Sequence, residues 1–96
     1  VEGLVTLLSD SNGELASLSA RALANLCFEH ADNRGRASKG AAALVRLCPA
    51  RTAVGCLGNL LSVADEAAAA AVEAGALEAV SGAVADAASR TLAVRA

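Results

Sequence analysis

The sequence predicts an all-α chain in which a helical unit recurs. Ala22–Leu26 and Cys56–Leu60 lie 34 positions apart and share the pattern x-Leu-x-Asn-Leu, and the apolar segment Leu4–Leu8 returns as Leu44–Cys48. Repetition at a spacing of about 20–50 residues is typical of a stacked array, in which each unit buries its apolar face against its neighbours. The chain is rich in alanine and lacks Ile, Tyr and Trp, which favours helices over strands.

The first helices follow from apolar spacing and turn chemistry. Residues 1–9 form a short apolar helix, and residues 10–13 form a turn that supplies an N-cap for the next helix, with Glu14 in its first turn. Residues at helical spacing are expected to form the buried stripe of this long helix, namely Leu15, Leu18, Ala22 and Leu26, widened by Leu23 and Cys27.

The middle of the chain repeats this order of helices. Asp32 is expected to cap a short helix over residues 33–39, which Gly40 ends in a left-handed conformation. Residues 41–48 form the next helix, and Pro49 starts a separate one that runs to about residue 62.

The last part of the chain holds three further predicted helices. Asp65 and Glu66 open the first, which Gly75 closes, and residues 76–85 and 86–95 form the other two. The resulting units span residues 1–39, 40–74 and 75–96, of which the first and last are incomplete. Because two apolar faces are then left bare, we expect contacts with neighbouring repeats or end-to-end self-association.

Composition and charge narrow the function classes. Ninety-six residues with 55% hydrophobic content describe one soluble unit. The net charge of −2 gives no electrostatic reason to bind nucleic acid or a membrane surface. No membrane span is expected, because Glu73 and Glu78 interrupt the most apolar stretch, residues 67–84. The start of the chain lacks a basic region followed by an apolar run, so no targeting signal is expected.

The cysteines indicate a reducing compartment and no metal or cofactor. Cys27, Cys48 and Cys56 make an odd count among apolar neighbours, which fits free thiols and a cytoplasmic or also nuclear location. Cys27 and His30 have C-x-x-H spacing, but structural zinc needs four ligands. The same pair lacks an orienting third group for nucleophilic catalysis, so we do not expect an enzyme.

The order of these motifs resembles the armadillo repeat. Glycine follows the first helix of a unit at Gly40 and Gly75, Leu-Val-x-Leu marks the second helix, and Leu-x-Asn-Leu marks the third. The resemblance implies an α-solenoid, a right-handed superhelix of about two and a third repeats. HEAT repeats, built from helix pairs, are the nearest alternative, but the short glycine-terminated helices argue against them. The segment from Leu44 to Asn59 is shorter than that from Leu4 to Asn25, which indicates a shortened third helix or a missing loop.

The resemblance also implies a peptide-binding groove on the concave face of the third helices. Its matching positions are Ser17, Arg21, Asn25, Arg51, Gly55 and Asn59. An Asn amide can pair with both groups of a peptide unit, and Arg21 and Arg51 favour an acidic ligand. At the positions where peptide-binding armadillo proteins tend to carry Trp, this chain has Arg21 and Gly55. The absence of these aromatic side chains argues against nuclear-import-type binding. The alternative is that the asparagines bond neighbouring helices and the arginines are only solvated.

The resemblance therefore predicts a non-catalytic scaffold that binds a protein or an extended peptide. A second hypothesis comes from Ala22–Glu29, which resembles repeats of armadillo-built guanine-nucleotide dissociation stimulators and implies a small-GTPase partner. A third is a purely architectural segment. Arg34, Arg36 and Lys39 form a basic run that we interpret as a solvated helix face, with contact to phosphate or an acidic partner as the alternative.

Overall fold

The computed structural model describes residues 1–48 and 50–95, with side chains described as far as Ala87, and the chain is all-α over these residues. Its elements are α1 (Glu2–Leu7), α2 (Gly13–Cys27), α3 (Ala31–Ala37), the 3₁₀ turn η1 (Ser38–Gly40), α4 (Ala41–Leu47), α5 (Arg51–Leu60), α6 (Glu66–Glu73) and α7 (Ala76–Arg95). The prediction of an all-α chain is confirmed. The expected role of Pro49 lies outside the described residues.

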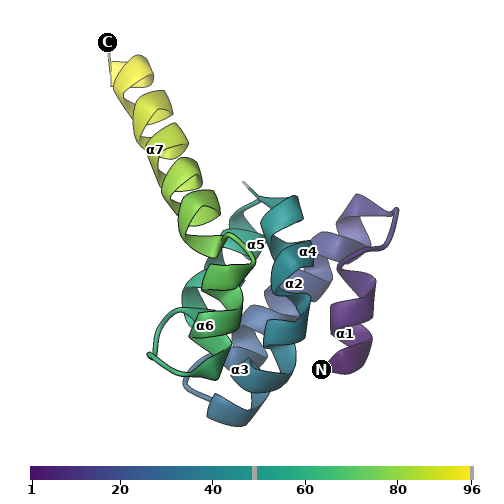
Figure 1. The fold of residues 1–96 in the computed structure, drawn as a ribbon. Helices are drawn as coiled ribbons and strands as arrows, with labels where there is room; N and C mark the ends of the chain where they lie inside the picture. Colours follow the sequence, from purple (N-terminus) through teal and green to yellow (C-terminus); the bar gives the residue numbers. More distant parts are fainter. Residues whose placement is uncertain (49, 96) are drawn as a thin grey trace.

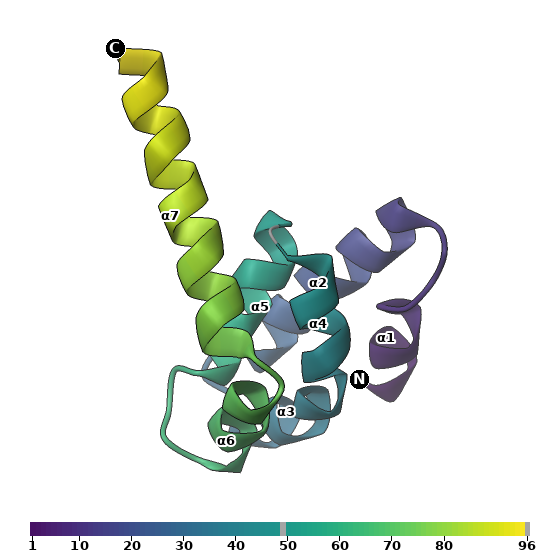
Figure 2. The same ribbon diagram turned by 45° about the horizontal axis from the view of Figure 1, so that its top comes forward.

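The helices form a packed body from which one helix projects (Figure 1). The most extensive packing between two helices is that of α2 against α5. Helices α3 and α6 lie together at one end of the body. Turning the molecule by 45° shows that α7 starts against the body and then runs out of it (Figure 2). The candidate binding positions on α2 and α5 are therefore held by the best-packed pair of helices.

The core consists of leucines surrounded by alanines. Leu23, Leu44, Leu57 and Leu60 are fully buried, together with the thiols of Cys27 and Cys56. The remaining buried hydrophobic positions are mostly alanine: Ala16, Ala20, Ala37, Ala41, Ala43, Ala53, Ala67, Ala71 and Ala76. Small side chains at these positions allow helices to approach closely while the leucines fill the space between them.

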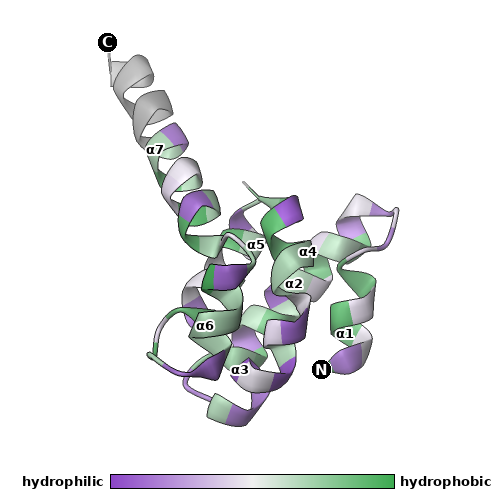
Figure 3. Cartoon of the chain, in the orientation of Figure 1, coloured by the Kyte–Doolittle hydropathy of each residue, from purple (hydrophilic) through white to green (hydrophobic). Residues whose placement is uncertain are grey.

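The buried face of α2 agrees with the predicted one at Leu23 and Cys27 and differs from it elsewhere. Ala16, Ala20, Leu23 and Cys27 are buried, and in the predicted stripe Leu15, Leu18 and Leu26 are 42%, 51% and 42% exposed. Both sets have helical spacing, so the apolar pattern alone could not decide between the two faces. The alanine-containing face is the one that lets α5 pack closely. Figure 3 shows hydrophobic colour on outward-facing parts of the helices as well as between them.

Two of the three predicted helix caps are confirmed. Asn12 Oδ1 accepts hydrogen bonds from the amides of Glu14 and Leu15 at 3.0 and 3.3 Å, and Asp65 Oδ1 accepts one from the amide of Ala68 at 3.2 Å. The prediction for α3 is wrong, because this helix begins at Ala31 and its N-cap is His30. Asp32 therefore lies inside the first turn, where its charge still complements the helix dipole.

The two glycines expected to end helices have different roles. Helix α6 ends at Glu73, and Gly75 follows with a φ of +95°, which confirms that this glycine closes the helix. Gly40 has a φ of −93°, so the prediction of a left-handed stop is wrong. A Cβ at Gly40 would lie 2.9 Å from Leu8 Cδ1 and 3.1 Å from Val5 Cγ1. Glycine is needed at this position because α1 packs closely against the chain there.

The C-terminal helix is continuous, and the predicted division between residues 85 and 86 is wrong. No proline or left-handed residue interrupts the alanine-rich segment, so the backbone continues as one helix. Within the described residues, no single helix has the length and apolar character required to cross a membrane. Helix α6 and residues 76–87 of α7 satisfy both conditions only as a pair, which is bent by 72°.

Candidate functional site

The candidate surface is formed by the exposed sides of α2 and α5, which two side-chain hydrogen bonds join. Ser17 Oγ lies 3.2 Å from Thr52 Oγ1, and Asn59 Nδ2 donates to the carbonyl oxygen of Ala24 at 2.6 Å. Both bonds join residues 35 positions apart, so the two helices run parallel in one constant register. The helix positions that lie between these two bonds are therefore fixed relative to one another.

The structure separates the two asparagines that the sequence made equivalent. Asn59 is half-buried, and its amide is bonded to Ala24 of the neighbouring helix. Asn25 is exposed, and its side chain has no hydrogen bond within the described part of the chain. Asn59 therefore bonds a neighbouring helix, which is the alternative to peptide binding given above for the two asparagines.

Most of the other predicted positions are exposed, and two of them are arginines. Arg21, Arg51 and Gly55 are exposed, and Ser17 is half-buried beside its bond to Thr52. Among the described residues, neither Arg21 nor Arg51 has an ion-pair partner. Two guanidinium groups on adjacent parallel helices can each donate a forked pair of hydrogen bonds to a carboxylate.

The backbone of α5 is uncovered at two glycines. Gly55 and Gly58 are exposed, and a Cβ built at either would meet no atom within 4 Å. Glycine inside a helix is destabilising by about 0.5–1 kcal/mol relative to alanine, and no neighbouring atom requires glycine here. The two residues instead leave a bare strip of helix that a ligand backbone can approach.

Replacing either glycine by alanine is expected to raise the free energy of unfolding by about 0.5–1 kcal/mol, because alanine restricts the unfolded chain and has space in the helix. Urea denaturation of Gly55→Ala and Gly58→Ala followed by circular dichroism measures this gain. Gly75→Ala is the matched control and should destabilise, since its φ of +95° is unfavourable for alanine. A loss of stability in both α5 variants would contradict the open surroundings described above.

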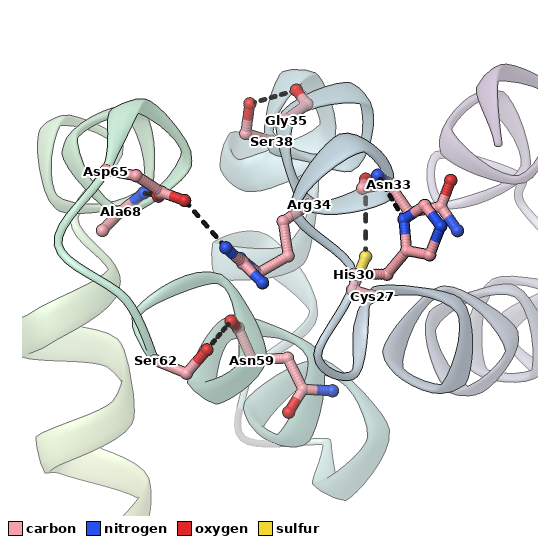
Figure 4. Close-up of polar contacts among 10 residues, drawn as sticks. All are labelled: Cys27, His30, Asn33, Arg34, Gly35, Ser38, Asn59, Ser62, Asp65 and Ala68. Carbon is pink, nitrogen blue, oxygen red and sulfur yellow. Dashed lines mark hydrogen bonds and ion pairs between the residues drawn. The ribbon is translucent and has the colours of Figure 1, made fainter.

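The interpretation of the basic run at 34–39 as a solvated face is wrong for Arg34, which is buried, whereas Arg36 and Lys39 are exposed. The Arg34 side chain is only 5% exposed, and its Nη2 lies 2.9 Å from Asp65 Oδ2 (Figure 4). Arg36 forms a two-pronged ion pair with Glu2, with Nε–Oε2 and Nη2–Oε1 distances of 3.0 and 2.6 Å. Each pair joins residues more than 30 positions apart, and no local pattern in the sequence marks these partners.

The corner between α2 and α3 uses Cys27, His30 and Asn33 for structure. Asn33 Nδ2 donates to the carbonyl of Leu26 at 2.9 Å, and Cys27 Sγ lies 3.6 Å from the carbonyl of Asn33. His30 Nδ1 accepts from the Asn33 amide at 3.2 Å, as Figure 4 shows. Both side chains of the C-x-x-H motif are thus engaged with backbone groups. In the part of the chain that the structure describes, no three His, Cys, Asp or Glu side chains form a group that could hold a metal.

The three thiols are free and shielded. Burial raises the pKa of Cys27 and of Cys48, and it raises the pKa of Cys56 to about 12, with the neighbouring Cys27 thiol adding to the effect. A thiol must ionise to act as a nucleophile, and a raised pKa makes ionisation at neutral pH less favourable. Their arrangement supports a packing role and no covalent chemistry.

A shallow groove of about 360 Å³ lies between the end of α4 and the first turns of α7. It is lined by Val45, Cys48, Glu78, Ala79, Gly82, Ala83 and Asp86. None of these residues belongs to the α2–α5 surface. The groove is open, and its walls are mostly small side chains that cannot enclose a ligand.

Comparison of the chain with protein-family models, with curated proteins and with solved structures found no match. The function is therefore inferred from the residues of the α2–α5 surface and their geometry.

Proposed function

We propose that the chain is a non-catalytic protein-interaction module of the armadillo-like α-solenoid type, which binds an extended acidic peptide on the α2–α5 surface. The observation that carries this proposal is the placement of two unpaired guanidinium groups, Arg21 and Arg51, around the uncovered backbone of Gly55 and Gly58. Carboxylates of the ligand would pair with the arginines, and its backbone would lie over the glycines.

Three features of the described residues support binding over catalysis. The thiols are shielded, His30 is used as a helix cap, and the groove between α4 and α7 is open and away from the arginines. The α2–α5 pair, by contrast, is rigidly held at both ends by the bonds of Ser17 and Asn59. A surface fixed in this way loses little conformational entropy when a ligand binds.

A library of fluorescently labelled extended peptides rich in Asp and Glu tests the proposal by anisotropy titration. Arg21→Ala and Arg51→Ala are each expected to weaken binding by roughly tenfold or more, because each removes a charge-assisted pair of hydrogen bonds. Arg46→Ala is the matched control: Arg46 is exposed on α4, outside the surface, and its loss should leave affinity nearly unchanged. Equal affinities for the wild type and the Arg21→Ala/Arg51→Ala double variant would refute the proposal.

The small-GTPase alternative makes a different prediction, for the residues that directly follow α2. Phe28 is 65% exposed, and the next residue, Glu29, has a φ of +53°, which is unusual for a non-glycine residue. An exposed aromatic side chain at a strained corner is a suitable contact for a partner domain. Faster nucleotide release from a Ras- or Rho-type GTPase that is lost in Phe28→Ala, but kept in Arg21→Ala, would favour this function.

A further inference from the structure

The corner between α2 and α3 is closed by hydrogen bonds that meet at His30 and Asn33. His30 Nδ1 accepts from the amide of Asn33 at 3.2 Å, and the carbonyl oxygen of His30 accepts from the amide of Arg34 at 3.0 Å. Asn33 Nδ2 donates to the carbonyl oxygen of Leu26 at 2.9 Å, which ties the first turn of α3 to the end of α2. Figure 4 shows the imidazole of His30 beside Asn33. The N-cap of α3 is therefore a titratable ring.

An imidazole can cap a helix in only one of its protonation states. Most N-caps are Ser, Thr, Asp or Asn, whose side-chain oxygen accepts the hydrogen bond. An imidazole nitrogen accepts only while it carries no proton, and both ring nitrogens are donors when the ring is charged. A charged His30 would direct an N–H toward the N–H of Asn33 and would place a positive charge at the positive end of the helix dipole. Proton binding thus removes the cap and adds repulsion.

The surroundings of His30 offer no close anion to offset this repulsion. The charged and titratable side chains of the elements that meet here are Cys27 of α2, Glu29 of the corner, Asp32, Arg34 and Arg36 of α3, Lys39 of η1, Asp65 at the start of α6 and Glu2 of α1. Both arginines of α3 are paired with the carboxylates of Asp65 and Glu2. Glu29 and Asp32 are exposed to solvent, and within the described residues neither forms an ion pair with His30. Solvent screening weakens the attraction of such exposed carboxylates for a charged imidazole.

The two residues before His30 depend on the closed corner. Glu29 has a φ of +53°, a left-handed conformation that a non-glycine residue keeps only where its surroundings hold it. Phe28 is 65% exposed, so packing of its own ring does little to fix it. If the bonds on the α3 side are released, Glu29 can return to a relaxed backbone conformation, and the position of Phe28 changes with it.

His30 is the only histidine in the sequence. Imidazole is the side chain that ordinarily changes charge between pH 5 and 8, because carboxyl groups titrate below this range and Lys and Arg above it. Burial raises the pKa of each of the three thiols and moves them further from this range. A side-chain response of these residues between pH 5 and 8 therefore has one origin.

We propose that the α2–α3 corner is a pH-sensitive switch, in which a neutral His30 caps α3 and a charged His30 opens the corner and releases Phe28. The cap stabilises the corner at neutral pH, and this contribution is lost as pH falls through the range in which imidazole binds a proton. The Arg34–Asp65 pair responds only at more acidic pH, since its titrating group is a carboxyl. The switch does not depend on the proposed peptide binding, which uses Arg21 and Arg51.

Nuclear magnetic resonance of the whole chain between pH 8 and 5 tests the switch. The amide signals of Glu29 and Asn33 are expected to shift with the same midpoint as the imidazole protons of His30. The protection of the Asn33 amide against hydrogen exchange, corrected for the intrinsic effect of pH, should fall roughly fivefold or more, as expected for loss of an N-cap. Amide signals at Glu29 and Asn33 that do not follow the imidazole would overturn the proposal, and this measurement needs only the wild type.

Two variants separate the titration from the capping. His30→Asn supplies an acceptor oxygen that does not titrate, so the protection at Asn33 should stay within about twofold over the whole pH range. His30→Ala has no acceptor, and its Asn33 amide should be as weakly protected at pH 8 as that of the wild type at pH 5. The proposal is wrong if His30→Asn keeps the pH dependence of the wild type, or if His30→Ala matches the wild type at pH 8.

Discussion

Leu23→Ala is expected to lower the free energy of unfolding by about 3 kcal/mol or more. Leu23 is fully buried in the C-terminal half of α2, and α1, α3 and α5 all pack against this helix. Truncating a buried leucine removes transfer free energy and leaves a cavity that the surrounding helices fill only in part, at a cost of about 2–5 kcal/mol. Domains of this size are stable by only about 5–15 kcal/mol, so the variant will be close to its unfolding limit.

Leu18→Ala is the matched control because it makes the same change on the same helix. Leu18 is 51% exposed, and we expect its truncation to cost less than about 1 kcal/mol. Urea denaturation of both variants gives the two losses in the free energy of unfolding. Equal losses would contradict the difference in burial between Leu18 and Leu23.

Arg34→Ala is expected to destabilise the chain by about 2–3 kcal/mol. The Arg34 side chain is almost fully buried, and its ion pair with Asp65 joins α3 to the start of α6. Alanine would leave a cavity and an Asp65 carboxylate without its cation. Arg34→Met should cost less, because it fills much of the space and also removes Nε, a buried donor without a partner among the described residues.

The same ion pair predicts a pH dependence. The hydrogen bond from Arg34, followed by that from the Ala68 amide, holds the pKa of Asp65 below its usual range. Because the folded pKa is lower than the unfolded one, the carboxylate stabilises the fold above the unfolded pKa, about 3.9 for Asp. This contribution is lost as pH falls from there through the folded pKa.

Thermal unfolding between neutral and acidic pH measures this effect. The Arg34→Ala variant should lose less stability on acidification than the wild type. Arg36→Ala is the comparison, since its partner Glu2, whose pKa Arg36 lowers to about 2, is exposed and screened by solvent. We expect a much smaller change in neutral-pH stability for that variant. A wild-type acid profile unchanged by Arg34→Ala would contradict the role of the pair.

Local chemistry made part of the fold predictable. Asn12 and Asp65 cap their helices through amides two or three residues away, and Gly75 needs only its own backbone conformation. The face that α2 buries depends instead on which neighbouring helix can approach it. Likewise, the role of Gly40 comes from contacts with Val5 and Leu8, about 30 residues earlier, which no local pattern shows.

The candidate site was predictable to the same extent. The armadillo resemblance selected Arg21, Arg51 and Gly55 as binding positions, and all three are exposed. It could not distinguish Asn25 from Asn59, because the two differ only in whether a neighbouring helix offers a carbonyl group. Arg34 was interpreted as solvated since its partner, Asp65, lies 31 residues further along the chain.

Because α2 and α5 keep one constant register, the spacing between Arg21 and Arg51 along the two helices is fixed. With bonds that join residues 35 apart, Arg51 is level with Ala16, five residues before Arg21 along the paired axes. That is about 7.5 Å along the helices and about 8–10 Å across them. An extended chain advances about 3.3 Å per residue, so two acidic side chains three or four residues apart match both arginines. Selectivity would then come from the spacing of acidic residues in the ligand and not from their number.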